Sequence, residues 1–166
     1  MIPFVVIWVF LVAQRLAELV VARRNTARLL AGGAVEHGAA HYPLFIVLHT
    51  AWLAALIVLA PADHLVHPGW LAVFVILQAG RIWAISSLGR YWTTRVIVMP
   101  GAKMVRRGPY RFLRHPNYVV VIAEIGLIPL MAGLAHVALV FSVLNIALLA
   151  WRIRIEEAAN APRAKV

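Results

Sequence analysis

The chain has 166 residues, of which 63% are hydrophobic, and its mean hydropathy is +0.86. Its formal net charge at pH 7 is +10, and it contains no cysteine. This composition is too apolar for a soluble globule, so we expect a single membrane-embedded domain over residues 1–166. The basic residues lie between long apolar stretches and form no continuous basic face, which argues against nucleic acid as a partner. Without cysteine there is no disulfide and no thiolate for nucleophilic attack or metal binding.

Five apolar stretches are long enough to cross a bilayer as helices. The first lacks the charged start and cleavage site of a signal peptide, so we expect it to remain as a span. Only Gly133 and Leu134 separate the last two stretches, which predicts a tight helical hairpin. The predicted fold class is therefore an all-α integral membrane protein of five transmembrane helices. Their approximate bounds are residues 2–21, 43–60, 69–88, 117–132 and 135–152.

Lysine and arginine are distributed unequally among the predicted loops. Apart from Arg15 and Arg81, the 16 basic residues lie after the first span, after the third span, or from Arg152 onward. The loops at residues 61–68 and 133–134 contain none. Because cytosolic loops are enriched in lysine and arginine, we expect the amino terminus outside and the carboxyl terminus in the cytosol.

Four ionisable residues fall inside the predicted spans: Arg15, Glu18, Arg81 and Glu124. Such residues are costly in lipid and are functional candidates. Arg15 and Glu18 have the spacing of a helical ion pair, and Glu124 could pair with Arg81 or line a cofactor cavity. They could also line the polar path of a small transporter, although the paired repeats and broken helices typical of transporters are not evident.

The longest polar segment, residues 89–115, lies on the predicted cytosolic side. A plain connector needs only a few residues, so this length indicates a function, with anchoring at the membrane surface as the simpler alternative. Residues 115–118 open the fourth span, and a proline in the first helical turn leaves free N–H groups for an acceptor on a ligand. Tyr110 and Tyr118 could stack on a flat ring such as adenine, and His115 could hydrogen-bond to it.

The carboxyl-terminal end of the fifth span carries two arginines and two glutamates. Arg152 and Glu156 are four residues apart and therefore share one helix face. A solvated ion pair is the simpler interpretation. The more specific hypothesis is that Glu156 accepts hydrogen bonds from the ribose hydroxyls or amino group of a cofactor, while Arg152 holds an anionic group of a substrate. Arg154 and Glu157 are the alternative pair in the same segment.

Other catalytic chemistries have weaker support. His37 and His41 are four residues apart, with His49 further on, but no acidic third ligand lies nearby, so we expect no metal. A hydrolase would need a nucleophile with a neighbouring base, and no serine has an evident partner.

Two motifs occur in a fixed order along the chain. Gly108-Pro109-Tyr110-Arg111-Phe112-Leu113-Arg114-His115-Pro116-Asn117-Tyr118 precedes the helical hairpin, and Arg152-Ile153-Arg154-Ile155-Glu156-Glu157 follows it. This ordered set resembles the isoprenylcysteine carboxyl methyltransferase family over residues 92–157, which is the expected catalytic region.

The resemblance implies S-adenosylmethionine as cofactor, bound in a cytosolic pocket formed by the loop and the carboxyl-terminal helical hairpin. It implies Arg152 as the substrate-binding residue, with Arg152 and Glu156 as the catalytic pair. Residues 14–18 and 38–48 look more like small bacterial members, some of which O-methylate alkylpyrones, and this suggests a bacterial inner membrane protein. The residues implied to contact cofactor are Ala102, Lys103, Met104, Val105, Tyr110, His115, Pro116, Asn117, Tyr118 and Glu156.

The expected function is O-methylation of a lipophilic anionic acceptor, either an isoprenylcysteine-like carboxylate or an alkylpyrone hydroxyl. An acceptor that is already ionised needs no general base, and the sequence offers none beside the proposed pocket. The expected partners are a lipophilic or prenylated substrate and membrane lipid. The alternatives are a phospholipid N-methyltransferase and a non-catalytic transporter or structural protein.

Overall fold

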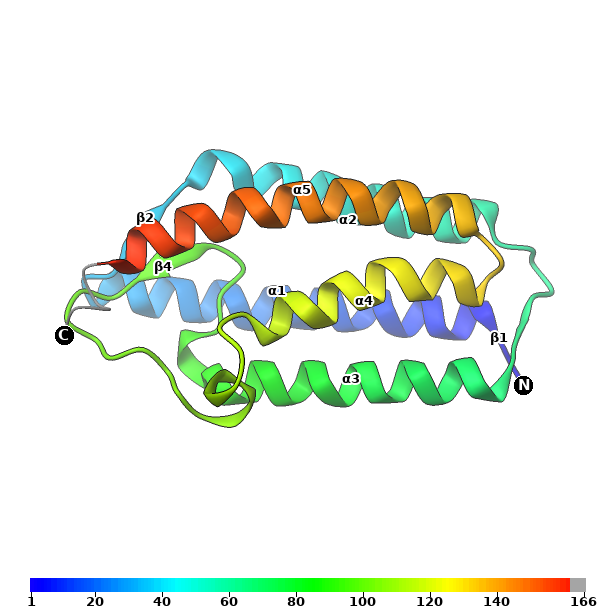
Figure 1. Cartoon of the computed structure of the whole chain (residues 1–166), viewed down its shortest axis with the longest axis horizontal. Coiled ribbons are helices and arrows are strands. Elements are labelled where there is room, and N and C mark those ends of the chain that lie inside the picture. The colour runs from blue at the N-terminus through cyan, green and yellow to red at the C-terminus, as the bar shows by residue number, and fades with distance from the viewer. Residues whose placement is uncertain (162–166) are drawn as a thin grey trace.

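The apolar stretches form five helices that lie side by side, because a backbone in lipid can satisfy its polar groups only within each helix (Figure 1). The computed structural model describes residues 1–161; Arg163 and Lys165, which belong to the basic carboxyl-terminal group, lie outside the described residues. The helices are α1 (Phe4–Ala31), α2 (Tyr42–Leu59), α3 (Pro68–Leu88), α4 (Pro116–Met131) and α5 (Ala135–Asn160).

The expectation of an all-α membrane protein agrees with the lengths and composition of these helices. The helices α1, α2, α3 and α5 are long and apolar enough to cross a membrane. The helix α4 is also apolar but has only 16 residues, or about 24 Å of helix. Its length is short for a bilayer core of about 30 Å, so the count of five spans stays a prediction.

Two helices are longer than the predicted spans. The helix α1 continues past residue 21 to Ala31 because Ala22, Asn25 and Leu29 recur at helical spacing and are buried. Asn25 Nδ2 donates hydrogen bonds to the carbonyls of Gly89 and Trp92, at 3.1 Å and 2.9 Å, which ties this extension to the loop after α3. The helix α5 likewise continues past residue 152 to Asn160.

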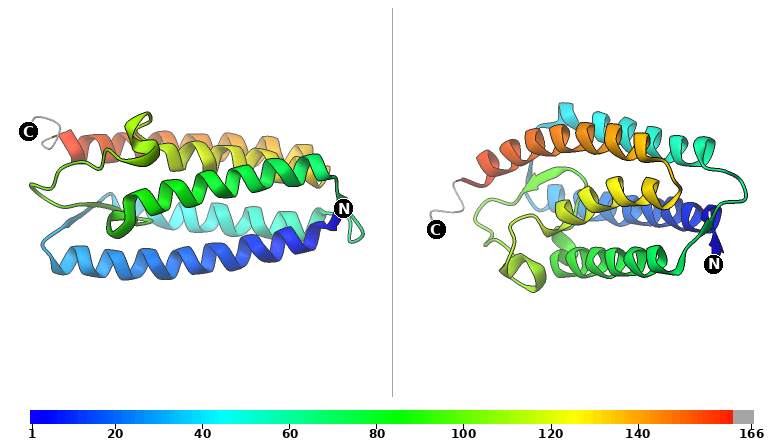
Figure 2. Two further views of the ribbon diagram at one scale, coloured as in Figure 1. Left: turned by 90° about the horizontal axis from the view of Figure 1, so that it is seen from below. Right: turned by 45° about the vertical axis from the view of Figure 1, so that its right-hand side comes forward.

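The connections between the helices lie at two opposite ends of the bundle (Figures 1 and 2). The amino terminus, the α2–α3 connection and the α4–α5 turn share one end, which we call the hairpin end. The described carboxyl-terminal part of α5 and the loop between α3 and α4 share the other, which we call the basic end. This grouping agrees with the alternation of charge in the sequence.

Two pairs of short strands, which were not predicted from the sequence, connect segments at the two ends of the helix bundle. At the hairpin end β1 (Ile2–Pro3) pairs antiparallel with β3 (Leu65–Val66). At the basic end β2 (Val35–His37) pairs with β4 (Val96–Val98), and Arg95 makes a 3.0 Å salt bridge to Glu36 beside this ladder. Val96 and Val98 are buried while Ile97 between them is less so, which is the alternation of a strand with one packed face. Three short 3₁₀ helices complete the fold: η1 (Ala39–His41), η2 (Gly89–Tyr91) and η3 (Gly108–Arg111).

The hydrophobic core fills the half of the bundle nearer the hairpin end. It joins all five helices and β3 around the fully buried Trp52, Leu56 and Ile128. Large apolar side chains from α1, α2 and α4 interdigitate there. This half of the bundle is therefore filled by packed apolar side chains.

A cluster of four charges closes the core on its other side. Arg15 and Arg81 each contact both Glu18 and Glu124, so α1, α3 and α4 are joined by ion pairs. Gln78 Nε2 donates a further 2.9 Å hydrogen bond to Glu124. Two positive and two negative charges cancel, which reduces the cost of placing them between membrane-spanning helices.

The cluster predicts a large effect of removing Glu124. The Glu124 side chain is fully buried, and Glu124→Ala leaves two arginines facing one carboxylate. We expect a loss of about 3–5 kcal/mol in unfolding free energy, measured by thermal or denaturant unfolding in detergent. Glu36→Ala, which removes the more exposed pair with Arg95, is the control and should cost no more than about 1 kcal/mol. Equal losses in the two variants would contradict the role given to the cluster.

Candidate functional site

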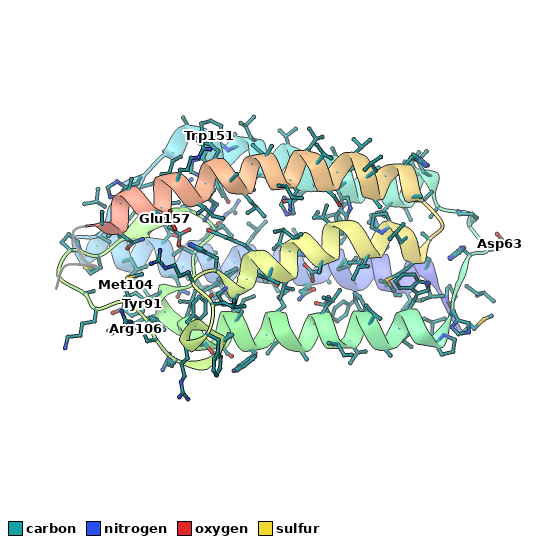
Figure 3. All side chains as sticks on the ribbon, viewed as in Figure 1. Asp63, Tyr91, Met104, Arg106, Trp151 and Glu157 are labelled. Carbon is teal, nitrogen blue, oxygen red and sulfur yellow. The ribbon has the colours of Figure 1, made fainter. Side chains whose placement is uncertain are left out.

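A cavity of about 430 Å³ opens into the half of the bundle nearer the basic end. Its wall includes residues of all five helices, of β4 and of the loop between α3 and α4. Figure 3 shows Tyr91 and Met104, which both line the cavity, at the end of the bundle where Glu157 lies, with Asp63 at the opposite end. The volume is within the usual range of about 300–1,000 Å³ for small-molecule sites.

Most of the residues implied to contact cofactor lie on this wall. Lys103, Met104 and Val105 come from the loop, Tyr110 from η3, and His115, Asn117, Tyr118 and Glu156 from the facing ends of α4 and α5. Ala102 and Pro116 are not part of the wall. The loop and the helical hairpin thus both contribute residues to one cavity, and its occupation by a cofactor stays a prediction.

Arg152, Tyr118 and Glu156 form a hydrogen-bonded chain in the wall. Arg152 Nε donates to Tyr118 Oη at 2.7 Å, and Tyr118 Oη donates to Glu156 Oε2. Because α5 continues as a regular helix, Arg152 and Glu156 lie on one face, and Tyr118 reaches them from the first turn of α4. The tyrosine hydroxyl therefore fixes the two charged groups relative to each other.

The rest of the Arg152 guanidinium is held by the opposite wall. Its Nη1 donates to the carbonyl of Thr94 at 2.8 Å, and its central carbon lies 5.4 Å from the centroid of the Phe45 ring. The hydroxyl of Thr94 hydrogen-bonds to that of Tyr42 at 3.1 Å. The remaining nitrogen, Nη2, makes no hydrogen bond to any residue from 1 to 161, so one donor group of this cavity-lining arginine is unused.

The alternative pair, Arg154 and Glu157, does not lie on the cavity wall. Both side chains are exposed, and Glu157 makes a 3.5 Å salt bridge to the exposed Arg114. The helical register of α5 therefore turns Arg152 and Glu156 toward the cavity and the other two residues away from it.

The amino terminus of α4 offers fewer free donors than expected. The amides of Tyr118 and Val119 both donate to the carbonyl of His115, at 3.0 Å and 3.4 Å. Asn117 is then the residue of this turn whose N–H lacks an acceptor among residues 1–161, and its Oδ1 is buried without a partner. The rings of His115 and Tyr118 stack on each other at 5.1 Å, so one face of Tyr118 is already covered.

Tyr110 enters the cavity from η3. Burial raises the pKa of its hydroxyl well above the usual range, and the nearby negative charge of Glu156 raises it further. The hydroxyl therefore remains protonated and is a hydrogen-bond donor beside a carboxylate.

Several cavity residues were not predicted to line the site, although His49 was considered as a metal ligand and residues 38–48 as part of the family resemblance. Tyr42, Phe45 and His49 line the wall from α2, and Thr94 does so from the segment before β4. The α2 residues recur at intervals of three or four, but an apolar span gives this periodicity little contrast. Thr94 reaches the cavity only through the unpredicted ladder of β2 and β4.

Gly108 allows the loop to approach α3 closely. Its φ is +57°, and a Cβ at this position would lie 2.0 Å from Ser87 Oγ and 2.9 Å from Ser87 Cβ. Only glycine fits this combination of left-handed backbone and close contact. Gly108 therefore fixes the start of η3, which carries Tyr110 into the cavity.

This contact predicts that Gly108→Ala loosens the loop. We expect the unfolding temperature to fall and trypsin to cleave at Arg106 or Arg107 at least several-fold faster, because the added methyl group forces η3 away from α3. Gly101→Ala is the control: φ is +70° there too, but no atom lies within 4 Å of the added Cβ. If the two variants were cleaved at the same rate, steric contact with Ser87 would not be what holds the loop.

Comparison with known proteins identifies the family. The model of the isoprenylcysteine carboxyl methyltransferase (ICMT) family matches residues 70–161. The chain is 41% identical over 153 residues to the uncharacterized protein YpbQ of Bacillus subtilis, covering 90% of this chain and 91% of that protein. It is 28% identical over 154 residues to an uncharacterized protein of Haemophilus influenzae, covering 90% of each. No solved structure matches it. The chain therefore belongs to the isoprenylcysteine carboxyl methyltransferase family of membrane methyltransferases.

Proposed function

We propose that the protein transfers a methyl group from S-adenosylmethionine to an oxygen atom of a lipophilic, anionic acceptor at the cytosolic face of the membrane. The observation that carries the proposal is the chain Arg152–Tyr118–Glu156 in the wall of one cavity. It places an unused guanidinium donor and a partly exposed carboxylate on opposite sides of one tyrosine hydroxyl. A cationic acceptor site and an anionic cofactor site are thus held side by side.

The residues near Glu156 fit S-adenosylmethionine. When bound, this cofactor supplies an activated methyl group on a sulfonium. The Glu156 carboxylate would accept hydrogen bonds from its ribose hydroxyls or its ammonium group. Among residues 1–161, neither the N–H of Asn117 nor its buried Oδ1 has a partner, and the two groups suit a ligand with both acceptors and donors. Tyr110, with one ring and one donor hydroxyl, fits a flat heterocycle better than Tyr118, because Tyr118 already stacks on His115.

Arg152 is the proposed acceptor-binding residue. Its Nε and Nη1 are used within the protein, which fixes the plane of the guanidinium and leaves Nη2 for an anionic oxygen. The nearby Phe45 ring offers an apolar surface to the rest of the acceptor. A carboxylate or an acidic enolic hydroxyl is already ionised near neutral pH, so its orientation by Arg152 can replace a general base.

Positioning and exclusion of water are the main contributions expected from the protein. Holding acceptor and methyl donor in contact geometry can supply about 7–11 kcal/mol of the barrier. Charge interactions within the cavity, between the charge cluster on one side and η3 and the loop on the other, would be strengthened where bound ligands exclude water.

We propose that the basic end faces the cytosol and that all five helices are spans of a bacterial inner membrane. The loop between α3 and α4 carries seven of the basic residues, whereas the residues of the hairpin-end connections carry none.

Among acceptors, a carboxylate of the isoprenylcysteine type and an alkylpyrone hydroxyl both satisfy the requirement for an ionised oxygen on a hydrophobic body. A transporter is disfavoured because the packed core continues beyond the charge cluster.

Binding of S-adenosylmethionine tests the cofactor site. We expect calorimetric titration of the detergent-purified protein to give binding that Glu156→Ala weakens at least 10-fold, since hydrogen bonds to a charged group contribute about 1.5–3 kcal/mol. Glu157→Ala, which removes a neighbouring carboxylate outside the cavity, is the control and should leave the affinity within about 3-fold. Equal affinities in the wild type and Glu156→Ala would reject the assignment.

Methyl transfer tests the acceptor site. In Arg152→Lys the positive charge remains but the planar group that contacts Tyr118 and Thr94 is lost. We expect kcat/KM for an anionic lipid acceptor to fall about 10- to 100-fold while affinity for cofactor changes far less. Arg154→Lys is the control with the same change on the exposed face. A similar loss in both variants would place acceptor recognition elsewhere.

A further inference from the structure

The wall of the cavity extends past Phe45 along α1 and α2, and we call this part of the cavity the arm. On α2 its wall runs from Tyr42 to Leu53, which is about 16 Å along the helix axis. Most of the arm is apolar, including Val12, Leu16 and Ile46. A polar group in this arm is therefore costly to bury unless it forms a hydrogen bond.

Most polar groups at the closed end of the arm are already paired. Arg15 and Arg81 line it, but their terminal nitrogens contact the carboxylates of Glu18 and Glu124. The charges of this cluster cancel. Among residues 1–161, the buried Nε of Arg15 is the one guanidinium nitrogen of the cluster without a partner, so the cluster offers a ligand one donor but no net positive charge.

His49 also lines this part of the cavity, and one of its ring nitrogens makes no hydrogen bond to residues 1–161. Its Nδ1 lies 2.9 Å from the carbonyl oxygen of Phe45, which can only accept, so Nδ1 carries the hydrogen. In the neutral ring Nε2 then has a free lone pair. Nε2 makes no hydrogen bond to the residues that the structure describes, and His49 lines the cavity. The side chain offers a hydrogen-bond acceptor to the cavity, between the apolar Ile46 and Leu53 on α2 and near Arg15 of α1.

Phe45 separates this acceptor from Arg152. The Arg152 guanidinium carbon lies 5.4 Å from the centroid of the Phe45 ring, and the His49 ring lies 6.4 Å from the same ring. His49 follows Phe45 by one helical turn, or about 6 Å, in the direction away from the basic end. The cavity thus has two polar positions, a cationic one at Arg152 and a neutral accepting one deeper in the membrane.

We propose that His49 is a specificity-determining residue for the acceptor. Nε2 accepts a hydrogen bond from a second polar group of the acceptor, a hydroxyl or amide N–H, on the side of the ionised oxygen that faces the arm. The preferred substrates are therefore lipids with an ionised oxygen and a nearby hydrogen-bond donor, and simple fatty carboxylates are poor ones. This inference rests on the proposed methyl transfer and extends it to the substrate class.

A matched pair of lipids tests the proposal. N-acetyl-S-farnesylcysteine and S-farnesylthiopropionic acid share the carboxylate and the farnesyl tail, and only the first has an amide N–H. With S-adenosylhomocysteine-loaded wild-type protein we expect the amide lipid to bind about 10- to 100-fold more tightly, because the other lipid leaves His49 Nε2 unpaired. His49→Phe, which keeps a ring but removes the acceptor, should reduce this ratio to within about 3-fold.

Two further variants separate recognition from a structural effect. His49→Gln supplies an amide oxygen in place of Nε2 and should restore part of the ratio. His136→Phe makes the same substitution at an exposed histidine near the hairpin end and should leave the ratio unchanged. The proposal is overturned if wild type and His49→Phe give the same ratio, or if neither lipid binds to protein that binds S-adenosylhomocysteine. A folded wild type that binds no S-adenosylhomocysteine overturns the proposed function instead.

Discussion

The structure depends on how four charges are accommodated in a membrane-spanning bundle. Arg15, Glu18, Arg81 and Glu124 lie on three helices and form four ion pairs, so the relative arrangement of α1, α3 and α4 is tied to these contacts. The packed core lies on one side of the cluster and the cavity on the other. Because the charges at the inner end of the cavity are paired, the cavity can extend between the helices without leaving an uncompensated charge in its wall.

The open half of the bundle is shaped by segments that lie outside the membrane helices. The ladder of β2 and β4 carries Thr94 to Arg152, and Gly108 lets η3 approach α3 closely enough to bring Tyr110 to the wall. Arg152 therefore receives hydrogen bonding partners from two directions and keeps one nitrogen unused. The proposed chemistry follows from this fixed geometry, because methyl transfer to an ionised oxygen requires orientation and a dry site more than proton transfer.

The sequence predicted the parts of this molecule that local pattern determines. Apolar length predicted the helices, two residues between spans predicted the hairpin, and the ordered motifs from Gly108 to Glu157 predicted the family, which the comparison confirms. Ion pairs between different helices were harder to predict from the sequence. Spacing could match Arg15 with Glu18, but the contact between Arg15 and Glu124 spans 109 positions. The strands were missed because three-residue ladders have little pattern, and His49 because nothing in an apolar helix marks which face borders a cavity.

The central claim is that one cavity holds the cofactor against Glu156 and the acceptor against Arg152. An experimental structure of the protein in lipid with S-adenosylhomocysteine bound tests it most directly. We expect ligand density inside this cavity, with polar atoms of the ligand within hydrogen-bonding distance of Glu156 and with the part of the cavity beside Arg152 and His49 left open. Density for the ligand at another site, or a ligand that fills the arm beside His49, would contradict it.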